Sequence, residues 1–287
     1  MNIIAETELI LTDENKIYHL NLSKHEIADD IILVGDPDRV SIISSKFDKI
    51  EHKVRNREFV THTGTLNGKR ISAIATGIGP DNIDIVINEL DALVNIDFKN
   101  RTINKTKKKL NLIRLGTSGA LQKNIAIDTF IASAYGLGFD GLAHFYCNKE
   151  ILEQKMADAY TVHANWPVNL AIPYFIKASA CLLDKFYDIK KGITATAPGF
   201  YGPQGRTLRL SPSIHNLHDK MESFNYEEKK ISNFEMETSA LYYLGQTLGH
   251  NTLTICAIIG NRLNKKYSKD YKKTIEKMID LVLKRIC

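Results

Sequence analysis

Cysteine is scarce in this sequence: 4 of 287 residues, which lie far apart at Cys147, Cys181, Cys256 and Cys287. No CxxC pair occurs, so the spacing favours neither a metal site nor the disulfide framework of a small secreted domain. We therefore expect reduced thiols, no bound metal and a cytoplasmic location.

Long apolar runs are also missing. The best of them, Leu253–Gly260, is interrupted by Thr254 and falls short of the roughly 18 residues that a membrane-spanning helix needs. Glu6 and Glu8 stand where a signal peptide would have basic residues before an apolar stretch. The chain has no internal repeat, low-complexity segment or Pro/Gly-rich linker. We therefore expect a single cytoplasmic domain over residues 1–287.

Charge of one sign is in only slight excess, since 38 Lys and Arg face 33 Asp and Glu, for a net charge of +5. A hydrophobic content of 44% and a charged content of 25% are ordinary for a globular protein, which excludes disordered and fibrous classes. The basic excess is concentrated in Lys99–Lys109 and Lys265–Lys273. The first run has neither a recognition motif nor interleaved aromatic residues, so we expect exposed loops, with no nucleic-acid or membrane partner.

Six apolar runs bounded by Gly or Pro predict buried strands, because most are continuous rather than alternating. They are Ile31–Gly35, Ile71–Gly77, Leu112–Gly116, Thr129–Ala134, Ile193–Ala197 and Leu253–Gly260. Apolar residues at helical spacing follow in Asp84–Val94 and in the last segment, from Ile275 to Ile286. This alternation predicts an α/β domain with a mostly parallel, mixed sheet flanked by helices, and with 99–109 as an exposed excursion.

Three motifs match known patterns only in part. Gly136–Gly141 reads GxGxxG, but no clear long helix follows and no acidic residue ends a second strand about 20 residues later. Gly116–Gly119 lacks the final glycine of a nucleophile elbow. His215 and His218 offer two metal ligands without a third. We do not expect a dinucleotide site, a serine nucleophile or a metal at these positions.

Arginines at the ends of predicted strands are the stronger signal. Arg39 follows Gly35 and a proline turn, and Arg114 stands in an otherwise apolar strand just before Thr117. A buried arginine is costly without an anion. Glycine turns, hydroxyl groups and guanidinium groups suit a phosphate dianion. The alternative is an arginine that pairs with a carboxylate of the core.

Two further segments carry polar groups. Glu235 and Glu237 lie two residues apart at the start of an apolar helix, so we expect only one to face a given site, and an acidic first turn that favours the helix dipole is the alternative. Gln204 and Arg206 lie in a Gly/Pro loop and can present an amide and a guanidinium group to a planar ring, on which Phe200 could stack.

In this order the segments resemble the nucleoside phosphorylase family, the purine and uridine phosphorylase superfamily, and within it the uridine phosphorylases. The resemblance extends from about Tyr18 to Arg262. The family's motifs appear as GDPxR (Gly35–Arg39), REF (Arg57–Phe59), RxGTxG (Arg114–Gly119), EME (Glu235–Glu237) and FYxxQxR (Phe200–Arg206).

The resemblance implies a role for each matching residue. Phosphate, the co-substrate, would bind Gly35, Arg39, Arg114, Thr117 and, from a neighbouring subunit, Arg57. Ribose would bind Glu237, the Met236 backbone and the neighbour's His19. The base would bind Phe200, Gln204, Arg206 and Ile259. Catalysis would rest on Arg206, Gln204 and Arg114. The resemblance implies at least a dimer, which the family commonly assembles into a hexamer, and no organic cofactor.

The resemblance also implies a pyrimidine substrate. Purine phosphorylases of the family place an aspartate after the late buried strand to protonate purine N7, and this chain has Gly260-Asn261-Arg262 there. Gly260 is smaller than the apolar residue usual beside the base, which leaves room for a substituted or different pyrimidine. Gly79-Pro-Asp-Asn82 departs from the family's sequence, so a monovalent-cation site near Glu58, Ile78 and residue 82 stays open.

The expected activity is the reversible phosphorolysis of uridine to uracil and ribose 1-phosphate, in pyrimidine salvage. The alternatives are phosphorolysis of thymidine, deoxyuridine or a purine nucleoside and, less in keeping with three phosphate-binding arginines, hydrolysis of a nucleoside. A nucleoside-binding or RNA-associated protein without enzymatic activity is a further alternative.

Overall fold

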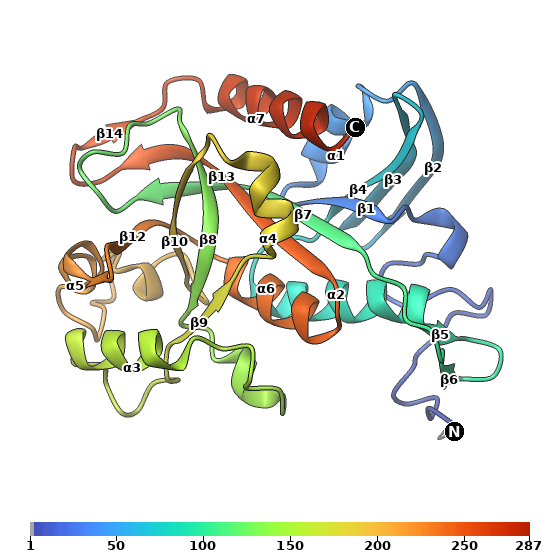
Figure 1. Cartoon of the computed structure of the whole chain (residues 1–287), viewed down its shortest axis with the longest axis horizontal. Helices are drawn as coiled ribbons and strands as arrows, with labels where there is room; N and C mark the ends of the chain where they lie inside the picture. Colours follow the sequence, from blue (N-terminus) through green and yellow to red (C-terminus); the bar gives the residue numbers. More distant parts are fainter. Residues whose placement is uncertain (1–2) are drawn as a thin grey trace.

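The computed structural model of the chain describes residues 3–287 and consists of one large mixed sheet with helices on both faces (Figure 1). All six expected strands form: β1 (Asp30–Val34), β4 (Lys69–Ala75), β7 (Asn111–Ala120), β8 (Phe130–Gly138), β10 (Lys190–Thr196) and β13 (Asn251–Asn261). Their apolar side chains are buried, as expected for strands covered on both faces. The predicted α/β class is confirmed.

Six other strands complete the sheet: β2 (Lys49–Asn56), β3 (Phe59–Leu66), β9 (Tyr174–Lys177), β11 (Asn225–Tyr226), β12 (Lys229–Glu235) and β14 (Lys266–Tyr267). The order is β11-β12-β10-β8-β13-β7-β1-β4-β3-β2, with β9 paired to β8 and β14 to β13. Strands β4, β1, β7 and β13 are parallel neighbours, so their carboxyl ends share one edge.

One pairing closes part of the sheet on itself. β12 pairs antiparallel with β7 through Phe234 and Gly119, and also pairs parallel with β10. Strands β7, β13, β8, β10 and β12 therefore form a closed ring, and the carboxyl end of β12 lies beside the second half of β7. The closure brings Glu235 to the strand that carries Arg114.

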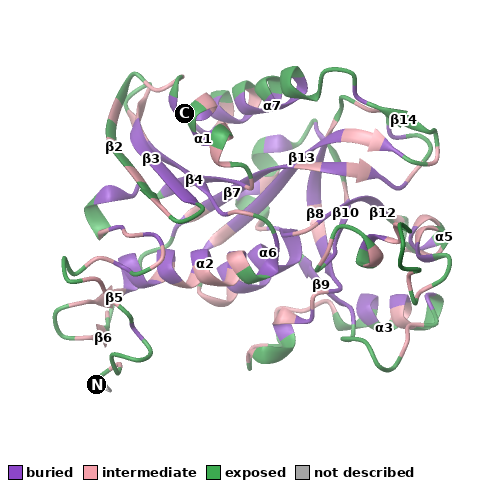
Figure 2. Cartoon of the chain, turned by 180° about the vertical axis from the view of Figure 1, so that it is seen from behind, coloured by how far each residue is buried: buried purple, intermediate pink, exposed green. Residues whose placement is uncertain are grey.

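Helices α1 (Pro37–Ser44) and α7 (Tyr271–Ile286) lie on one face of the sheet, and α2 (Pro80–Asn95) and α6 (Thr238–Thr247) on the other (Figure 1). Asp36 and Asp270 cap α1 and α7 by accepting backbone N–H bonds in the first turn. The predicted apolar stripe of α7 is buried, and Figure 2 shows the alternation of buried and exposed residues along this helix. Of the shorter helices, α3 (Gln154–His163) packs on β9, α4 (Ala180–Leu183) on β13 and α5 (Leu217–Ser223) on β12.

Residues 99–109 are largely exposed, and β6 (Thr102–Ile103) within them pairs with β5 (Ile96–Asp97) just before them to form a two-stranded hairpin. Arg101 holds the hairpin against the N-terminal segment by donating from Nε to the Ile4 carbonyl at 2.9 Å. The fold is a single domain in the part that the structure describes, and residues 1–2 lie outside it. No helix of residues 3–287 is long and apolar enough to cross a membrane.

The structure explains the partial motif matches. Gly136 lies within β8, where a Cβ atom would come within 3.0 Å of Ser239 Cα, so this glycine lets α6 pack closely on the strand. The segment after it forms only a short 3₁₀ turn, Leu142–Phe145, instead of a phosphate-binding helix. Gly116–Gly119 forms part of β7 and makes no strand-to-helix turn.

Candidate active site

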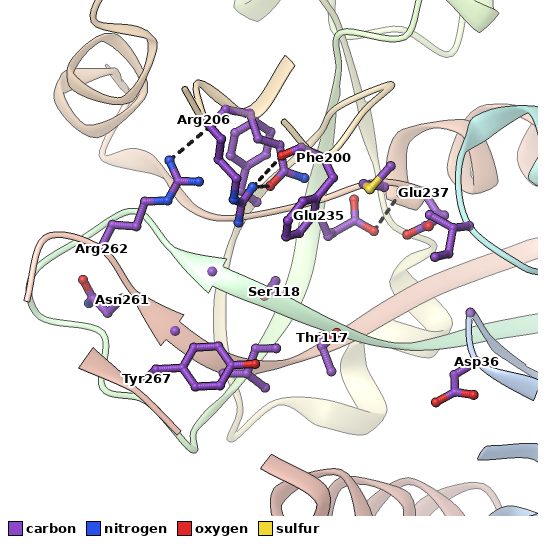
Figure 3. A pocket seen from close by; sticks show the side chains of 18 of the residues that line it. Asp36, Thr117, Ser118, Phe200, Arg206, Glu235, Glu237, Asn261, Arg262 and Tyr267 are labelled. Atoms are coloured by element: carbon purple, nitrogen blue, oxygen red, sulfur yellow. Dashed lines mark hydrogen bonds between the residues drawn. The ribbon is translucent and has the colours of Figure 1, made fainter. Parts of the chain in front are cut away.

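A cavity of about 900 Å³ opens at the carboxyl ends of β1, β7, β12 and β13 (Figure 3). Ligands bind at this edge in α/β sheets, because the loops that follow the strands converge there. Ten of the twelve residues expected from sequence line it: Gly35, Arg39, Arg114, Thr117, Phe200, Gln204, Arg206, Met236, Glu237 and Ile259.

Gly35 and Arg39 come from the turn between β1 and α1. A Cβ atom on Gly35 would lie 3.3 Å from the Gly77 carbonyl oxygen, so a larger residue would press on the neighbouring turn. Arg39 lies in the first turn of α1 and is half-buried, with Nε 3.8 Å from the Asp36 carboxylate. Burial lowers the pKa of Arg39, and the nearby charge of Arg114 lowers it further. An anion between the two guanidinium groups would relieve this repulsion.

Arg114 is buried in β7 and pairs with both carboxylates of the Glu235–Glu237 segment. Its Nη2 donates to Glu237, and its Nη1 lies 3.1 Å from Glu235 Oε2. Burial alone would lower the Arg114 pKa, but Glu237 and Glu235 outweigh it and raise that pKa. The buried Nε and Nη1 have no hydrogen-bond partner within residues 3–287, and Nη1 is held by the charge of Glu235 alone.

The expectation that only one of the two glutamates faces the site was wrong. Glu235 ends β12 and Glu237 precedes α6, so the pair is not held to the spacing of a helix. Glu235 also accepts from the backbone N–H of Thr238 at 3.0 Å, as the helix-dipole alternative proposed. Glu237 accepts from the Gly79 N–H at 2.9 Å. Both glutamates thus pair with Arg114 and line the cavity, and Glu235 in addition fixes the start of α6.

Glu237 is almost fully buried, and burial raises its pKa above the ordinary glutamate value. Arg114 acts in the opposite direction and favours the ionised form, whereas Glu235 adds to the rise. The ionised form depends on Arg114, so the charge of the arginine and the acceptor strength of Glu237 are linked.

The loop from Phe200 to Arg206 forms the opposite wall. Gly205 has a φ of +61°, which glycine adopts without strain and which reverses the chain between Gln204 and Arg206. The Arg206 guanidinium lies over the Phe200 ring, with Cζ 3.7 Å from the ring centroid, and donates to the Phe200 carbonyl at 2.7 Å and to Gln204 Oε1. The amide and guanidinium groups are therefore side by side, as the spacing predicted.

Ile259 enters the cavity through an irregularity in β13. The pairing register with β7 shifts between Ile258 and Gly260, so Ile259 has no partner in β7, and its carbonyl accepts from Ser268 N–H at 2.8 Å. Such bulges redirect a side chain beside a binding site. The sequence shows only an apolar run here and does not reveal the bulge.

Asn261 is buried and has a structural role. Its Nδ2 donates to the carbonyls of Gln122 at 3.0 Å and Ile125 at 2.8 Å, and its Oδ1 accepts from Asn264 N–H. With both donors occupied, this side chain holds the end of β13 to the 122–125 loop. It has no proton to offer a base.

His19 and Arg57 do not line the cavity. They lie beside each other through Tyr18, whose hydroxyl accepts from Arg57 at 3.3 Å and whose ring lies edge-on to His19. His19 is held by Glu89, with Nδ1 2.6 Å from Oε1. This chain alone therefore does not bring these two residues to its own cavity.

Several lining residues were missed or assigned no role from the sequence. Arg262, Lys265, Lys266 and Tyr267 line the end of the cavity beside Arg206. Arg262 donates to the Gln204 carbonyl at 3.3 Å and contacts His218 Nε2 at 2.5 Å. The two lysines belong to the basic run that we expected to be a solvated loop, and nothing in its composition distinguishes them from the other lysines there.

Known proteins resemble this chain in sequence and in fold. The profile of the phosphorylase superfamily matches residues 29–286. The chain belongs to the phosphorylase superfamily. A uridine phosphorylase of Thermococcus kodakarensis is 31% identical to this phosphorylase over 265 residues, 91% of this chain and 83% of the relative. A DeoD-type purine nucleoside phosphorylase of Streptococcus suis is 29% identical, covering 86% of this chain and 87% of the relative.

The solved structures agree with the sequence relatives. The crystal structure of a Trypanosoma brucei nucleoside phosphorylase, reported to show uridine phosphorylase activity, superposes on this phosphorylase with a TM-score of 0.86. The two share 26% identity, over 96% of this chain and 98% of the other. The family resemblance and the fold predicted from sequence are confirmed.

Proposed function

We propose that this phosphorylase catalyses the reversible phosphorolysis of uridine to uracil and ribose 1-phosphate. The observation that carries the proposal is the cavity with arginines and a glutamate at one end and an amide–guanidinium pair at the other (Figure 3). The names of the Thermococcus kodakarensis and Trypanosoma brucei proteins support it.

Phosphate would bind where the β1 turn meets β7. The cationic groups of Arg39 and Arg114 face this end, with the Gly35 backbone and the Thr117 hydroxyl beside them. Charge-assisted hydrogen bonds from guanidinium groups suit a dianion, and two arginines fix its orientation. A phosphate oxygen held in this way can attack C1′ from the side opposite to the base.

Ribose would bind between phosphate and base at Glu237 and the Met236 backbone. The Glu237 oxygens already accept from Arg114 and Gly79, but a carboxylate offers about four acceptor positions and retains capacity for two hydroxyl groups. Because both oxygens are held by the protein, the sugar would meet a carboxylate of fixed direction.

Bond breaking would place negative charge on the base. As the C1′–N1 bond breaks and the phosphate oxygen bonds to C1′, the electron pair leaves with uracil, which takes a proton from solvent. Arg206 would stabilise the charge at uracil O4, and Gln204 would pair with O2 and N3–H. Burial and Arg262 lower the pKa of Arg206 to about 10, so it stays charged at neutral pH. Phe200 and Ile259 would pack on the ring.

His19 and Arg57 would complete the site of a neighbouring subunit. Both lie outside this chain's cavity, and Glu89 and Tyr18 hold them in fixed positions. We therefore propose a dimer, alone or as the unit of a hexamer, in which these two residues reach the partner's ribose and phosphate. No organic cofactor is required, since phosphate is the second substrate. Dependence on a monovalent cation is tested by assays in potassium, sodium and choline chloride. A cytoplasmic location stays a prediction.

A panel assay tests the proposal. Uridine, thymidine, deoxyuridine and inosine are incubated with and without phosphate, and base release is followed by ultraviolet absorbance. Phosphate-dependent turnover with uridine preferred over inosine is expected. Preference for inosine would favour the purine alternative. The Asn261 amide argues against that alternative, because it donates its protons to backbone carbonyls and has none for a purine. Base release without phosphate would favour hydrolysis and overturn the proposal.

A further inference from the structure

The end of the cavity beside the base-reading loop is strongly basic. Four cationic residues line it: Arg206, Arg262, Lys265 and Lys266. The carboxylates that line the same cavity all belong to the opposite end: Asp36, Glu235 and Glu237. Figure 3 shows this separation, with Arg206 and Arg262 on one side and the three acids on the other. A neutral pyrimidine does not require so many charges of one sign.

These cations have no acidic partner inside the protein. Among residues 3–287, no ion pair forms to any of the four, whereas Arg114 at the other end has two. Burial lowers the pKa of Arg206, and the nearby charge of Arg262 lowers it further. Arg262 itself contacts the Gln204 carbonyl and Nε2 of the neutral His218 imidazole. Within residues 3–287, no acidic side chain pairs with the four cationic residues at this end.

The same end has room for more than uracil. At about 900 Å³ the cavity lies near the top of the range of about 300–1,000 Å³ for small-molecule sites. Gly260 forms part of its wall without a side chain of its own, and a Cβ atom there would already be in van der Waals contact with Tyr267 Cδ2 at 3.4 Å. A substituent on the base can thus extend past Arg206 toward the β13–β14 turn.

We propose that this end of the cavity binds a negatively charged substituent on the pyrimidine, so that the enzyme accepts uridines carrying a carboxylate on C5. The inference rests on the proposed function, because it takes the O4 atom of uracil to lie at Arg206. C5 is bonded to C4, so a C5 substituent extends along the O4 edge toward Arg262 and the two lysines. A substituent on C6 would instead lie against the sugar.

Two substrates of matched shape separate charge from size: 5-carboxyuridine and uridine-5-carboxamide. The ratio of the kcat/KM of the carboxylate to that of the carboxamide is expected to be at least about fivefold in the unmodified enzyme at low salt, since a charge pair at about 4 Å is favourable by about 1 kcal/mol even in water. The ratio should fall toward one in Lys265→Ala/Lys266→Ala and should decrease with added salt.

The control variant Lys105→Ala/Lys109→Ala removes the same charge from the exposed excursion and should keep the ratio of the unmodified enzyme. Calorimetric binding of the two compounds in the presence of phosphate gives the same comparison without turnover. A carboxamide that is bound or turned over as well as the carboxylate overturns the inference, as does an equal loss of preference in both double variants. Failure of the proposed function is a separate result, in which uridine itself is not cleaved.

Discussion

Arg114 and Glu237 are 123 residues apart in the sequence and form a buried ion pair in the wall of the cavity. Arg114 lies in β7 and Glu237 follows the end of β12, so the pair ties together the two strands that close the ring of the sheet. It also joins the proposed phosphate end of the site to the proposed ribose end. Substitutions at either residue should therefore affect stability and both ligands together.

Removal of Arg114 should destabilise the fold as well as the site. Arg114→Ala leaves Glu235 and Glu237 buried without their cation, a change expected to cost about 3–5 kcal/mol in the free energy of unfolding. Urea denaturation measures it. The control Lys108→Ala breaks an exposed ion pair with Asp29 at 2.5 Å and should cost at most about 1 kcal/mol. Equal effects of the two substitutions would contradict the buried pairing.

Arg206 should act mainly on bond breaking. Arg206→Ala is expected to reduce kcat on uridine by about 10²–10³, or about 2.7–4 kcal/mol, the effect of removing one donor from a developing oxyanion. Steady-state kinetics on uridine measure it. Arg209→Ala, an exposed arginine of the same loop that does not line the cavity, is the control and should leave kcat unchanged. Unaltered turnover in Arg206→Ala would remove this residue from the mechanism.

Gly116 should tolerate no side chain. It lies two residues after Arg114 on the same face of β7, and a Cβ atom at Gly116 would collide with the Arg114 guanidinium. Gly116→Ala should displace that group and raise the KM for phosphate at least about tenfold, since charge-assisted hydrogen bonds are lost. Gly119→Ala, whose Cβ would meet only the Gly260 carbonyl at 3.9 Å, serves as the control for folding. A normal phosphate KM in Gly116→Ala would contradict the packing.

The acidic limb of the pH profile should report Glu237. Burial raises the pKa of its carboxyl above 4.5, and only the ionised form accepts from both ribose hydroxyls. Activity should therefore fall as the pH decreases through this raised pKa. Stability should change in the opposite direction. A carboxyl whose pKa is raised by folding stabilises the folded state at pH values below its pKa in the unfolded chain, and this stabilisation is lost as the pH rises through its pKa in the folded state.

Glu237→Gln isolates this contribution, because phosphate titrates equally in both enzymes. The residual kcat/KM of the variant should show a weaker decline on the acidic side than that of the unmodified enzyme. Identical profiles would assign the acidic limb to phosphate alone.

Shared sites predict complementation between inactive subunits. Arg57→Ala and Arg206→Ala damage the same site from different chains, so a mixed dimer contains one site with both defects and one intact site. Refolding an equal mixture should restore about a quarter of the activity of the unmodified enzyme, because half of the dimers are mixed. An equal mixture of Arg57→Ala and Arg209→Ala chains, refolded in the same way, is the matched control. Light scattering measures the oligomeric state, and full activity as a monomer would exclude the shared site.

The sequence predicts the fold well where patterns are strong. Continuous apolar runs locate the six central strands, and the spacing of Ile275 to Ile286 locates the last helix. β2 was not predicted, because it alternates exposed and half-buried residues and contains only Ile50 and Val54 as aliphatic residues. β12 was not predicted either, since its apolar side chains are few and it is stabilised by pairing with strands distant in the sequence.

The sequence predicts the candidate-site residues that belong to recognisable motifs. Ten of the twelve expected residues line one cavity, because the parallel strands β1, β7 and β13 and the closure of β12 on β7 bring their segments together. The sequence did not predict a role for Arg262, Lys265 and Lys266. A basic segment that lines a cavity cannot be distinguished by composition from a basic segment in a solvated loop. The double contact of Arg114 with Glu235 and Glu237 also escaped, since it depends on the closure of β7 against β12.

Asn261 has a consequence for how this enzyme could change its substrate over time. An aspartate at this position would direct a carboxylate at the carbonyl oxygens of Gln122 and Ile125, which now receive two amide protons. The exchange would acquire the acid that purine chemistry uses while repelling the loop that anchors β13. A route from pyrimidine to purine cleavage through this single codon is therefore closed unless the 122–125 loop is rebuilt first.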